Sequence, residues 1–250
     1  MLTKIVHGSP TDHTPLLIAH GLYGSARNWG AIARRLSDIR EVTAVDMRNH
    51  AGSPWFDTHS YPDMASDLAD VLATPSDVIG HSMGGKAAMV LALKYPDAVR
   101  RLVVADIAPV TYGHTQLPMI EAMQSVDLTT VRNRRDVDEQ LAQLVPDATV
   151  RAFLLQSLDV KAKTWQLNLK VLAAEMPKII GFPEMSGSFD GPTLFLSGAE
   201  SDYVTRAHHE RIRSLFPKAR FVKIPKAGHW LHAEQPRAFE EAVRFFLSDG

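Results

Sequence analysis

The chain has 250 residues, and 45% of them are hydrophobic, which is enough for a large buried core and too many for a disordered chain. Its 27 Lys and Arg residues nearly balance 28 Asp and Glu residues, so the composition argues against a nucleic-acid partner. The absence of cysteine excludes disulfides, thiolate metal sites and a thiol nucleophile. No apolar run reaches the roughly 20 residues of a membrane span. The first residues lack the pattern of a signal peptide, so we expect a soluble, cytoplasmic protein without membrane insertion.

Apolar strand patterns alternate with helical patterns in the first part of the chain. The predicted strands are 15–19, 41–46, 77–80 and 101–105. The predicted helices that follow them are 25–36, 64–72 and 86–95. Strands joined by helices of this length form βαβ units, so we predict a mostly parallel sheet with helices on its faces.

The alternation stops near Pro109, and the chain then carries helical patterns without a convincing strand. Helices are expected at 137–144, 150–158 and 167–176. The α/β pattern resumes with strands at 193–196 and 221–224 and helices at 206–215 and 237–247. An interruption of roughly 70 residues is too long for an ordinary loop. We therefore predict an α/β core, residues 1–112 and 186–250, with a helical cap at 113–185.

The strongest chemical signal is Gly80-His81-Ser82-Met83-Gly84, a G-x-S-x-G pattern that follows an apolar strand and opens a helix. A strand that turns directly into a helix holds its middle residue in a strained, left-handed conformation, so the residues two positions away must be small. The bend pushes the Ser82 hydroxyl out of the carboxyl edge of the sheet. The pattern predicts a nucleophilic serine rather than a helix cap.

A serine hydroxyl is a weak nucleophile unless a base removes its proton. In proteins with this type of serine bend, the three residues of the triad follow one another along the chain as serine, acid and histidine, so we expect the base after Ser82. Of the five later histidines, His229 lies in a glycine-containing loop after a late strand. His208 and His209 fall within a helical pattern, and His232 suits a structural role. We therefore predict His229 as the base.

The segment His20-Gly21-Leu22-Tyr23-Gly24 follows the first predicted strand and suits an oxyanion hole. Acyl transfer develops a negative oxygen, which two converging amide N–H groups stabilise. We predict that the amides of Leu22 and Met83 provide these donors. His20 is expected to brace the loop.

The acid that orients His229 has two candidates. Asp106 ends the strand at 101–105, and Asp202 lies on a longer loop after the strand at 193–196. Both follow the nucleophile and precede the base, so chain order does not separate them. The spacing alone leaves the choice nearly even.

Several motif blocks occur in a characteristic order: His20-Gly21, Asp46 to His50, Gly80 to Lys86, Asp106 to Pro109 and Gly228 to Glu234. They resemble the α/β-hydrolase superfamily and, within it, the small bacterial YbfF-type esterases, from about residue 15 to the C-terminus. The resemblance implies an α/β-hydrolase fold with Ser82, His229, Leu22 and Met83 in the roles described above. It favours Asp106 as the acid, because the wider superfamily carries its acid at the position of Ser201, one residue before Asp202.

Two departures from the superfamily pattern accompany the resemblance. The segment before residue 15 has room for one strand, at 2–6, where the full fold has two. The usual Arg-Gly-His-Gly is replaced by Arg48-Asn49-His50-Ala51-Gly52. This loop is expected to be structural, with Asp46 and Arg48 bracing the entrance to the site.

The sequence therefore predicts a serine carboxylesterase that hydrolyses short- to medium-chain acyl esters through an acyl-enzyme, without cofactor or metal. Tyr23, His81 and Trp230 are expected to contact the small-molecule ester or thioester substrate. Eight apolar or aromatic residues are candidates for the lining of the substrate pocket, and two or three of them are expected to face the substrate. They are Trp230, Tyr112, Met119, Met123, Phe153, Leu154, Trp165 and Leu169. An acyl thioesterase, a cofactor-free perhydrolase and a carbon–carbon bond hydrolase are alternatives on the same triad, and a ligand sensor with vestigial turnover is another. The oligomeric state is not predicted.

Overall fold

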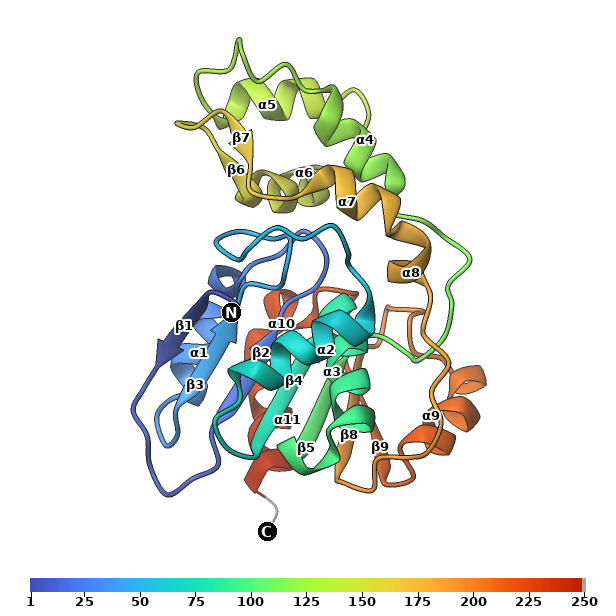
Figure 1. Ribbon diagram of the computed structural model, residues 1–250. Helices are drawn as coiled ribbons and strands as arrows, with labels where there is room; N and C mark the ends of the chain where they lie inside the picture. The colour runs from blue at the N-terminus through green and yellow to red at the C-terminus, as the bar shows by residue number, and fades with distance from the viewer. Residues whose placement is uncertain (249–250) are drawn as a thin grey trace.

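A seven-stranded sheet forms the centre of the computed structural model, which describes residues 1–248 (Figure 1). Its strand order is β1-β3-β2-β4-β5-β8-β9, and β1 alone in this sheet runs antiparallel to its neighbour. The strands are β1 (Lys4–His7), β2 (Leu16–Ala19), β3 (Val42–Val45), β4 (Ser76–His81), β5 (Val99–Ala105), β8 (Thr193–Gly198) and β9 (Ala219–Ile224). The predicted α/β fold is confirmed, with its first strand at 4–7 instead of 2–6.

Helices cover both faces of the sheet and bury a separate hydrophobic core on each. Neighbouring residues of one strand face opposite cores, as Leu16 and Leu17 of β2 do, because side chains alternate along a strand. One face carries α1 (Gly30–Leu36), α10 (Leu231–Glu234) and α11 (Pro236–Ser248); the other carries α2 (Tyr61–Val71), α3 (Met83–Lys94) and α9 (His209–Leu215). Short 3₁₀ helices are Ala26–Trp29, Pro96–Ala98, Leu155–Ser157 and Arg206–His208.

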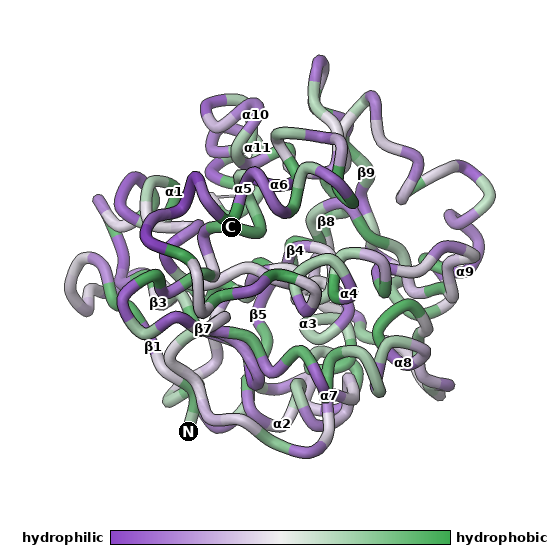
Figure 2. Tube along the Cα trace, turned by 90° about the horizontal axis from the view of Figure 1, so that it is seen from above, coloured by the Kyte–Doolittle hydropathy of each residue, from purple (hydrophilic) through white to green (hydrophobic). Residues whose placement is uncertain are grey.

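The chain between β5 and β8 forms a helical layer above one edge of the sheet (Figure 1). Its helices are α4 (Leu117–Ser125), α5 (Arg134–Leu141), α6 (Ala148–Leu154), α7 (Leu169–Ala174) and α8 (Met176–Ile180). Seen from above, α4, α6 and β7 overlie β4, β5 and α3 (Figure 2). We call residues 113–185 the cap, although these exact limits stay a prediction.

The cap also contains a small β-hairpin, so the expectation that this segment has no strand was wrong. β6 (Leu158–Asp159) pairs antiparallel with β7 (Thr164–Trp165). The turn between them is held by the Asp159 carboxylate, which accepts a hydrogen bond from the Ala162 amide at 2.9 Å. Lys163 adopts a positive φ of 53° that reverses the chain. Strands of two residues are too short to leave an alternating pattern. The predicted helix 150–158 covers the end of α6 and the 3₁₀ helix Leu155–Ser157, and it extends by one residue into β6.

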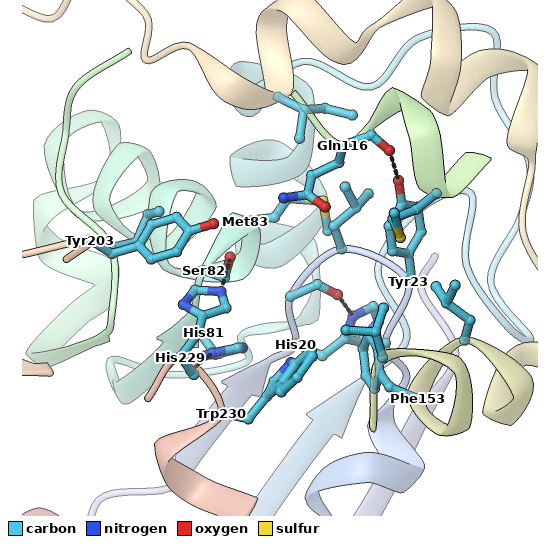
Figure 3. Close-up of a pocket in the computed structure, with 18 of the residues that line it drawn as sticks. His20, Tyr23, His81, Ser82, Met83, Gln116, Phe153, Tyr203, His229 and Trp230 are labelled. Carbon is cyan, nitrogen blue, oxygen red and sulfur yellow. Dashed lines mark hydrogen bonds between the residues drawn. The ribbon is translucent and has the colours of Figure 1, made fainter. Parts of the chain in front are cut away.

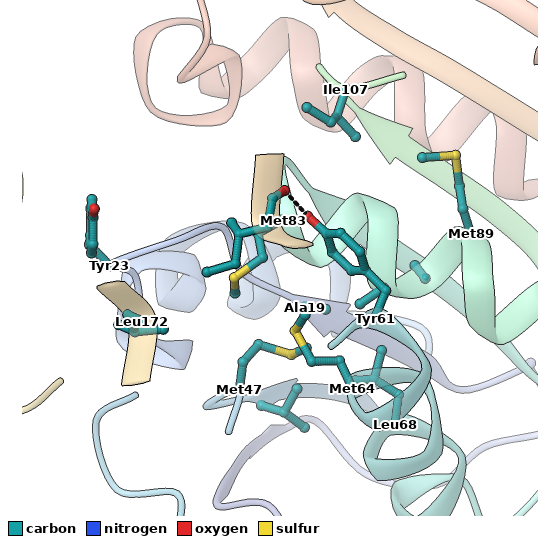
Figure 4. Close-up of a cluster of buried hydrophobic side chains, with 14 of the residues drawn as sticks. Ala19, Tyr23, Met47, Tyr61, Met64, Leu68, Met83, Met89, Ile107 and Leu172 are labelled. Atoms are coloured by element: carbon teal, nitrogen blue, oxygen red, sulfur yellow. Dashed lines mark hydrogen bonds between the residues drawn. The ribbon is translucent and has the colours of Figure 1, made fainter. Parts of the chain in front are cut away.

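Methionines pack the core beneath the bend that joins β4 to α3. Met47 and Met64 lie among buried side chains below Met83, the residue after Ser82 (Figure 4). Unbranched methionine side chains fill irregular spaces of this kind well. The packing holds the start of α3, and with it Ser82, in a fixed position on the sheet.

Lys86 is an unusual member of this core, since its side chain is 1% exposed. Its ammonium donates hydrogen bonds to the carbonyls of Val110 at 2.9 Å, Ile180 at 2.9 Å and Gly181 at 2.6 Å. Burial lowers the pKa of Lys86 to about 7, while three acceptors match the three N–H groups of the charged form. Val110 precedes the cap and Ile180 ends its last helix, so one side chain joins both ends of the cap to α3.

Replacing this lysine tests whether it stabilises the junction. Lys86→Met keeps an apolar stem but removes the donor from three carbonyls, so we expect the free energy of unfolding to fall by about 2–4 kcal/mol. Lys94→Met, at the exposed end of the same helix, should change it by less than about 0.5 kcal/mol. Urea denaturation followed by circular dichroism measures both. Equal unfolding midpoints for the two variants would contradict this role.

Candidate active site

Ser82 lies at the bend where β4 passes into α3. Its backbone has φ 52° and ψ −119°, a conformation that a residue with a side chain rarely adopts. A Cβ added to Gly80 would lie 2.3 Å from the Gly84 carbonyl oxygen, and one added to Gly84 would lie 2.4 Å from the Ala19 oxygen. The two glycines are therefore required by close backbone approach. The bend turns the serine hydroxyl toward the cap.

Three side chains from distant parts of the sequence form a hydrogen-bonded chain at this edge of the sheet. Figure 3 shows two of them, Ser82 and His229. The Nε2 atom of His229, in the loop after β9, lies 3.0 Å from the Ser82 Oγ. Its Nδ1 atom lies 2.7 Å from Oδ2 of Asp106, which directly follows β5. A carboxylate only accepts hydrogen bonds, so Nδ1 carries the proton and the Nε2 lone pair faces the hydroxyl. This tautomer is the one that can take a proton from serine.

Asp106 is fully buried, and its carboxylate has further donors. The Gly198 amide donates to Oδ1 at 3.1 Å, and the Ser201 hydroxyl donates to Oδ2 at 2.5 Å. Asp202, the alternative acid, is exposed, and no hydrogen bond joins it to His229 in the described part of the chain. The geometry therefore brings Asp106 to the imidazole and leaves Asp202 outside. The hydrogen bond from Ser201 to Asp106 was not predicted, although the position of Ser201 just after the end of β8 places it at the same edge of the sheet as Asp106.

Tyr203 is a second neighbour that the sequence analysis missed. Its ring stacks on the His229 imidazole, with centroids 4.1 Å apart and planes 24° apart. Its hydroxyl lies 2.9 Å from Nε2 of His114 in the cap. The stacking limits rotation of the imidazole, so Tyr203 helps to keep His229 in line with Ser82.

Two backbone amides near Ser82 are available for a ligand oxygen. Met83 is the first residue of α3, where amides have no partner within the helix. Leu22 lies in a turn that the Gly24 amide closes on the Gly21 carbonyl at 3.0 Å. Within residues 1–248, neither the Leu22 nor the Met83 amide donates to a protein acceptor. Amides without a protein acceptor at the wall of the same cavity are one requirement of an oxyanion hole, and the role of Leu22 and Met83 stays a prediction.

A cavity of about 450 Å³ lies over Ser82 between the sheet edge and the cap. Tyr23, His81 and Trp230 all line it, although the His81 Nε2 atom is hydrogen-bonded to the His229 carbonyl at 2.8 Å. Four residues of the predicted lining set also line it: Tyr112, Met119, Phe153 and Leu154. Together with Trp230 they border the cavity, and the expectation that two or three of the set face a substrate stays a prediction.

Met123, Trp165 and Leu169 are absent from the cavity wall, because they pack within the cap itself. The Trp165 indole donates to the Met123 carbonyl at 2.9 Å, and all three residues are buried. Helical spacing shows that such residues share an apolar face. It does not show whether that face meets the cavity or a neighbouring helix.

Three buried histidines lie in a row behind the Leu22 turn. Ring centroids of His20 and His50 are 5.2 Å apart, and those of His50 and His59 are 5.4 Å apart. His20 Nε2 accepts from the Met47 amide at 2.9 Å, and His50 Nε2 accepts from the Tyr23 amide at 3.2 Å. Burial lowers the pKa of His20 to about 4 and that of His50 to about 3. Both rings are neutral near pH 7 and serve as acceptors.

Comparison with known proteins agrees with this geometry. A model of the alpha/beta hydrolase family matches residues 16–242. The chain belongs to this family. The "sn-1-specific diacylglycerol lipase ABHD11" of Mus musculus is 42% identical over 247 residues, covering 93% of this chain and 80% of the relative. "Esterase YbfF" of Escherichia coli (strain K12) is 37% identical over 245 residues, covering 95% and 94%.

A solved structure titled "Marine microorganism esterase" is also similar, with a TM-score of 0.93, 37% identity and 98% coverage of both chains. The predicted resemblance to YbfF-type esterases is therefore confirmed, and the chain is an esterase- or lipase-type alpha/beta hydrolase. Among residues 1–248, no helix has the length and apolar character of a membrane span. The cytoplasmic location stays a prediction.

The buried histidines predict a specific acid sensitivity. The pKa of His50 is about 3 in the folded protein, below the roughly 6.5 of an exposed histidine, so the unfolded chain binds the proton between these pH values. The stability that neutral His50 contributes is present above about pH 6.5 and is lost as the pH falls toward 3, by up to about 1.4 kcal/mol per pH unit.

We expect His50→Gln to reduce the slope of unfolding free energy against pH between about pH 6.5 and 4.5, since this proton uptake is removed. The matched control is His13→Gln, at an exposed position. Urea denaturation across this pH range measures the slope. An unaltered slope in His50→Gln would show that the folded protein already binds that proton.

Proposed function

We propose that this protein is a serine carboxylesterase that hydrolyses short- to medium-chain acyl esters through an acyl-enzyme. Ser82 is the nucleophile, His229 the general base and Asp106 the orienting acid. The observation that carries the proposal is the hydrogen-bonded chain of Ser82 Oγ, His229 and Asp106, with distances of 3.0 and 2.7 Å. No cofactor or metal takes part in the proposed reaction.

Acylation begins when Ser82 Oγ attacks the ester carbonyl carbon and His229 Nε2 takes the hydroxyl proton. The carbonyl oxygen becomes negative and accepts hydrogen bonds from the Leu22 and Met83 amides. When the tetrahedral intermediate collapses, the C–O bond to the alcohol breaks and His229 returns the proton to the departing oxygen. Asp106 stays ionised and stabilises the imidazolium during both steps.

Deacylation repeats this sequence with water. His229 removes a proton from a water molecule as the water attacks the acyl carbonyl, and the same two amides stabilise the second oxyanion. The bond to Ser82 Oγ then breaks, and the imidazolium returns its proton to the serine. The products are a carboxylic acid and free enzyme.

The cavity supports a restricted range of acyl chains. Its volume of about 450 Å³ lies in the lower half of the range for ligand pockets. Met119, Phe153, Leu154 and Trp230 give much of its wall an apolar character, and the rings of Phe153 and Trp230 are 5.4 Å apart. An acyl chain of modest length can bury its methylene groups against these side chains and leave room in the cavity for the alcohol part of the ester.

Substitution of the triad tests the assigned roles. Ser82→Ala should lower kcat for p-nitrophenyl butyrate by more than about 10³-fold, because it removes the attacking oxygen. Asp106→Asn should lower it by about 10³–10⁴-fold, because an amide favours the wrong tautomer of His229. Asp202→Asn, at an exposed position, is the matched control and should stay within about twofold.

Circular dichroism shows that each variant is folded. A fluorophosphonate probe should label the peptide that contains Ser82 in the unaltered protein and leave Ser82→Ala unlabelled. Labelling at a different serine, or a large loss in Asp202→Asn with none in Asp106→Asn, would refute the assignment.

Chain-length preference tests the substrate range. Along p-nitrophenyl esters from acetate to palmitate, kcat/KM should be highest at about four to eight acyl carbons, because a chain of this length buries its methylene groups against the apolar wall beside Ser82. Hydrolysis of matched acyl thioesters and perhydrolysis are measured under the same conditions. A maximum at palmitate would contradict the proposed range, and faster turnover of thioesters would favour the thioesterase alternative.

A further inference from the structure

Tyr23 has a backbone conformation that a tyrosine rarely adopts. It is the third residue of the turn from Gly21 to Gly24, and its φ is 64°. This position of a turn favours glycine or asparagine when φ is positive. A bulky residue persists there only where its surroundings hold it firmly, and such places are often functional. The side chain is 5% exposed, so those surroundings are protein.

Two hydrogen bonds hold Tyr23 from opposite ends. Its hydroxyl donates to the carbonyl of Gln116 at 2.9 Å (Figure 3). Its amide donates to His50 Nε2 at 3.2 Å. Nδ1 of His50 lies 2.9 Å from the Arg48 carbonyl, which only accepts, so the Nε2 lone pair is free for the Tyr23 amide. Gln116 immediately precedes α4 and belongs to the cap.

The His50 loop is itself joined to another part of the cap. The Ala51 amide donates to the Gln166 carbonyl at 2.7 Å, and the Asn168 amide donates to the Asn49 carbonyl at 3.0 Å. His50 forms an isolated antiparallel bridge with Leu167 between these bonds. Both hydrogen-bond partners of Tyr23 are therefore positioned by the cap, at segments 50 residues apart in the sequence.

We propose that Tyr23 is a positioning residue that couples the cap to the oxyanion hole. This inference depends on the proposed role of the Leu22 amide. The Tyr23 amide shares its peptide group with the Leu22 carbonyl, so holding the Tyr23 amide and ring constrains the short turn, closed between Gly21 and Gly24, that carries the Leu22 N–H. When the cap is seated, both bonds of Tyr23 form and the Leu22 amide points at the substrate oxygen. When the cap shifts, the strained turn loses these bonds and relaxes.

This role differs from the direct substrate contact that the sequence analysis expected. The Tyr23 hydroxyl already donates its proton to Gln116, so it has no proton left to offer a ligand. A residue that acts through the oxyanion hole affects the transition state, whereas a substrate contact affects binding of the ground state as well. Kinetics therefore separates the two roles.

The test compares Tyr23→Phe with Tyr61→Phe. The Tyr61 hydroxyl also joins the core to the cap, through the Ile179 carbonyl at 2.5 Å, but Tyr61 lies outside the oxyanion turn. Loss of a whole oxyanion donor costs about 10²–10³-fold in kcat, so a misdirected donor should cost about 10-fold. We expect Tyr23→Phe to lower kcat by about 10-fold, with KM within about twofold and the same factor for acetate and butyrate esters. The loss in Tyr61→Phe should be at least about fivefold smaller.

An alkyl trifluoromethyl ketone gives a second readout. Its adduct with serine places a negative oxygen in the oxyanion hole, so its inhibition constant should rise in Tyr23→Phe by the same factor as kcat falls. Thermal melting of both variants shows how far each loosens the fold.

Equal kinetic losses in the two tyrosine variants would overturn the proposal, because they would reflect general loosening of the cap. A change confined to KM, or one that depends on acyl length, would overturn it in favour of a substrate contact. Unaltered kinetics and inhibition in Tyr23→Phe would also overturn it. If Ser82→Ala abolishes turnover while Tyr23→Phe has no effect, this inference alone fails. If Ser82→Ala retains activity, the proposed function fails first.

Discussion

The hydrogen bond between Asp106 and His229 makes the strongest demand on the rest of the structure. Burying a carboxylate is costly unless donors replace its water, and this one has three: the Gly198 amide, the Ser201 hydroxyl and His229 Nδ1. Asp106 directly follows β5, and these donors lie at the end of β8, in the loop after it and in the loop after β9. The order β5-β8-β9 places the three strand ends side by side at one edge. The parallel sheet thereby brings three hydrogen-bond donors to the buried carboxylate and turns the His229 imidazole toward Ser82.

Burial keeps the two histidines beside His229 neutral. The rings of His81 and His229 are 4.8 Å apart, and His232 lies 4.7 Å from His81. Burial lowers the pKa of His81 well below its usual value and lowers that of His232 to about 3. Neither neighbour is charged near pH 7, so no adjacent cation opposes protonation of His229. In the proposed mechanism, the imidazolium that forms on His229 therefore has no charged histidine beside it, and the Asp106 carboxylate stabilises it.

Local patterns in the sequence were sufficient to predict the sheet, its helices and the bend at Ser82. The strands are apolar throughout because both faces are covered, and the glycines around Ser82 mark a close approach that no other residue permits. The Ser82–His229 contact was predicted because motifs mark both residues, whereas contacts between distant loops that carry no motif were not predictable. The Ser201 hydroxyl reaches a carboxylate 95 residues away, and the stacking of Tyr203 on His229 depends on two loops whose lengths carry no such signal. The choice between Asp106 and Asp202 likewise depends on sheet geometry, since both follow strands.

Three residues at the cavity or directly behind it have a strained, positive φ, and their supports differ. Ser82 and Asp106 each have a φ of 52°, and Tyr23 has 64°. The supports of Ser82 and Asp106 described here, close backbone approach and hydrogen bonds at strand ends, belong to the α/β core. The supports of Tyr23 belong to the cap or are positioned by it. The hydrogen-bonded chain of Ser82, His229 and Asp106 is therefore held mainly by the core, whereas the proposed oxyanion turn also depends on the cap. Under the proposed coupling, the transition state is stabilised fully only while the cap holds both hydrogen bonds of Tyr23.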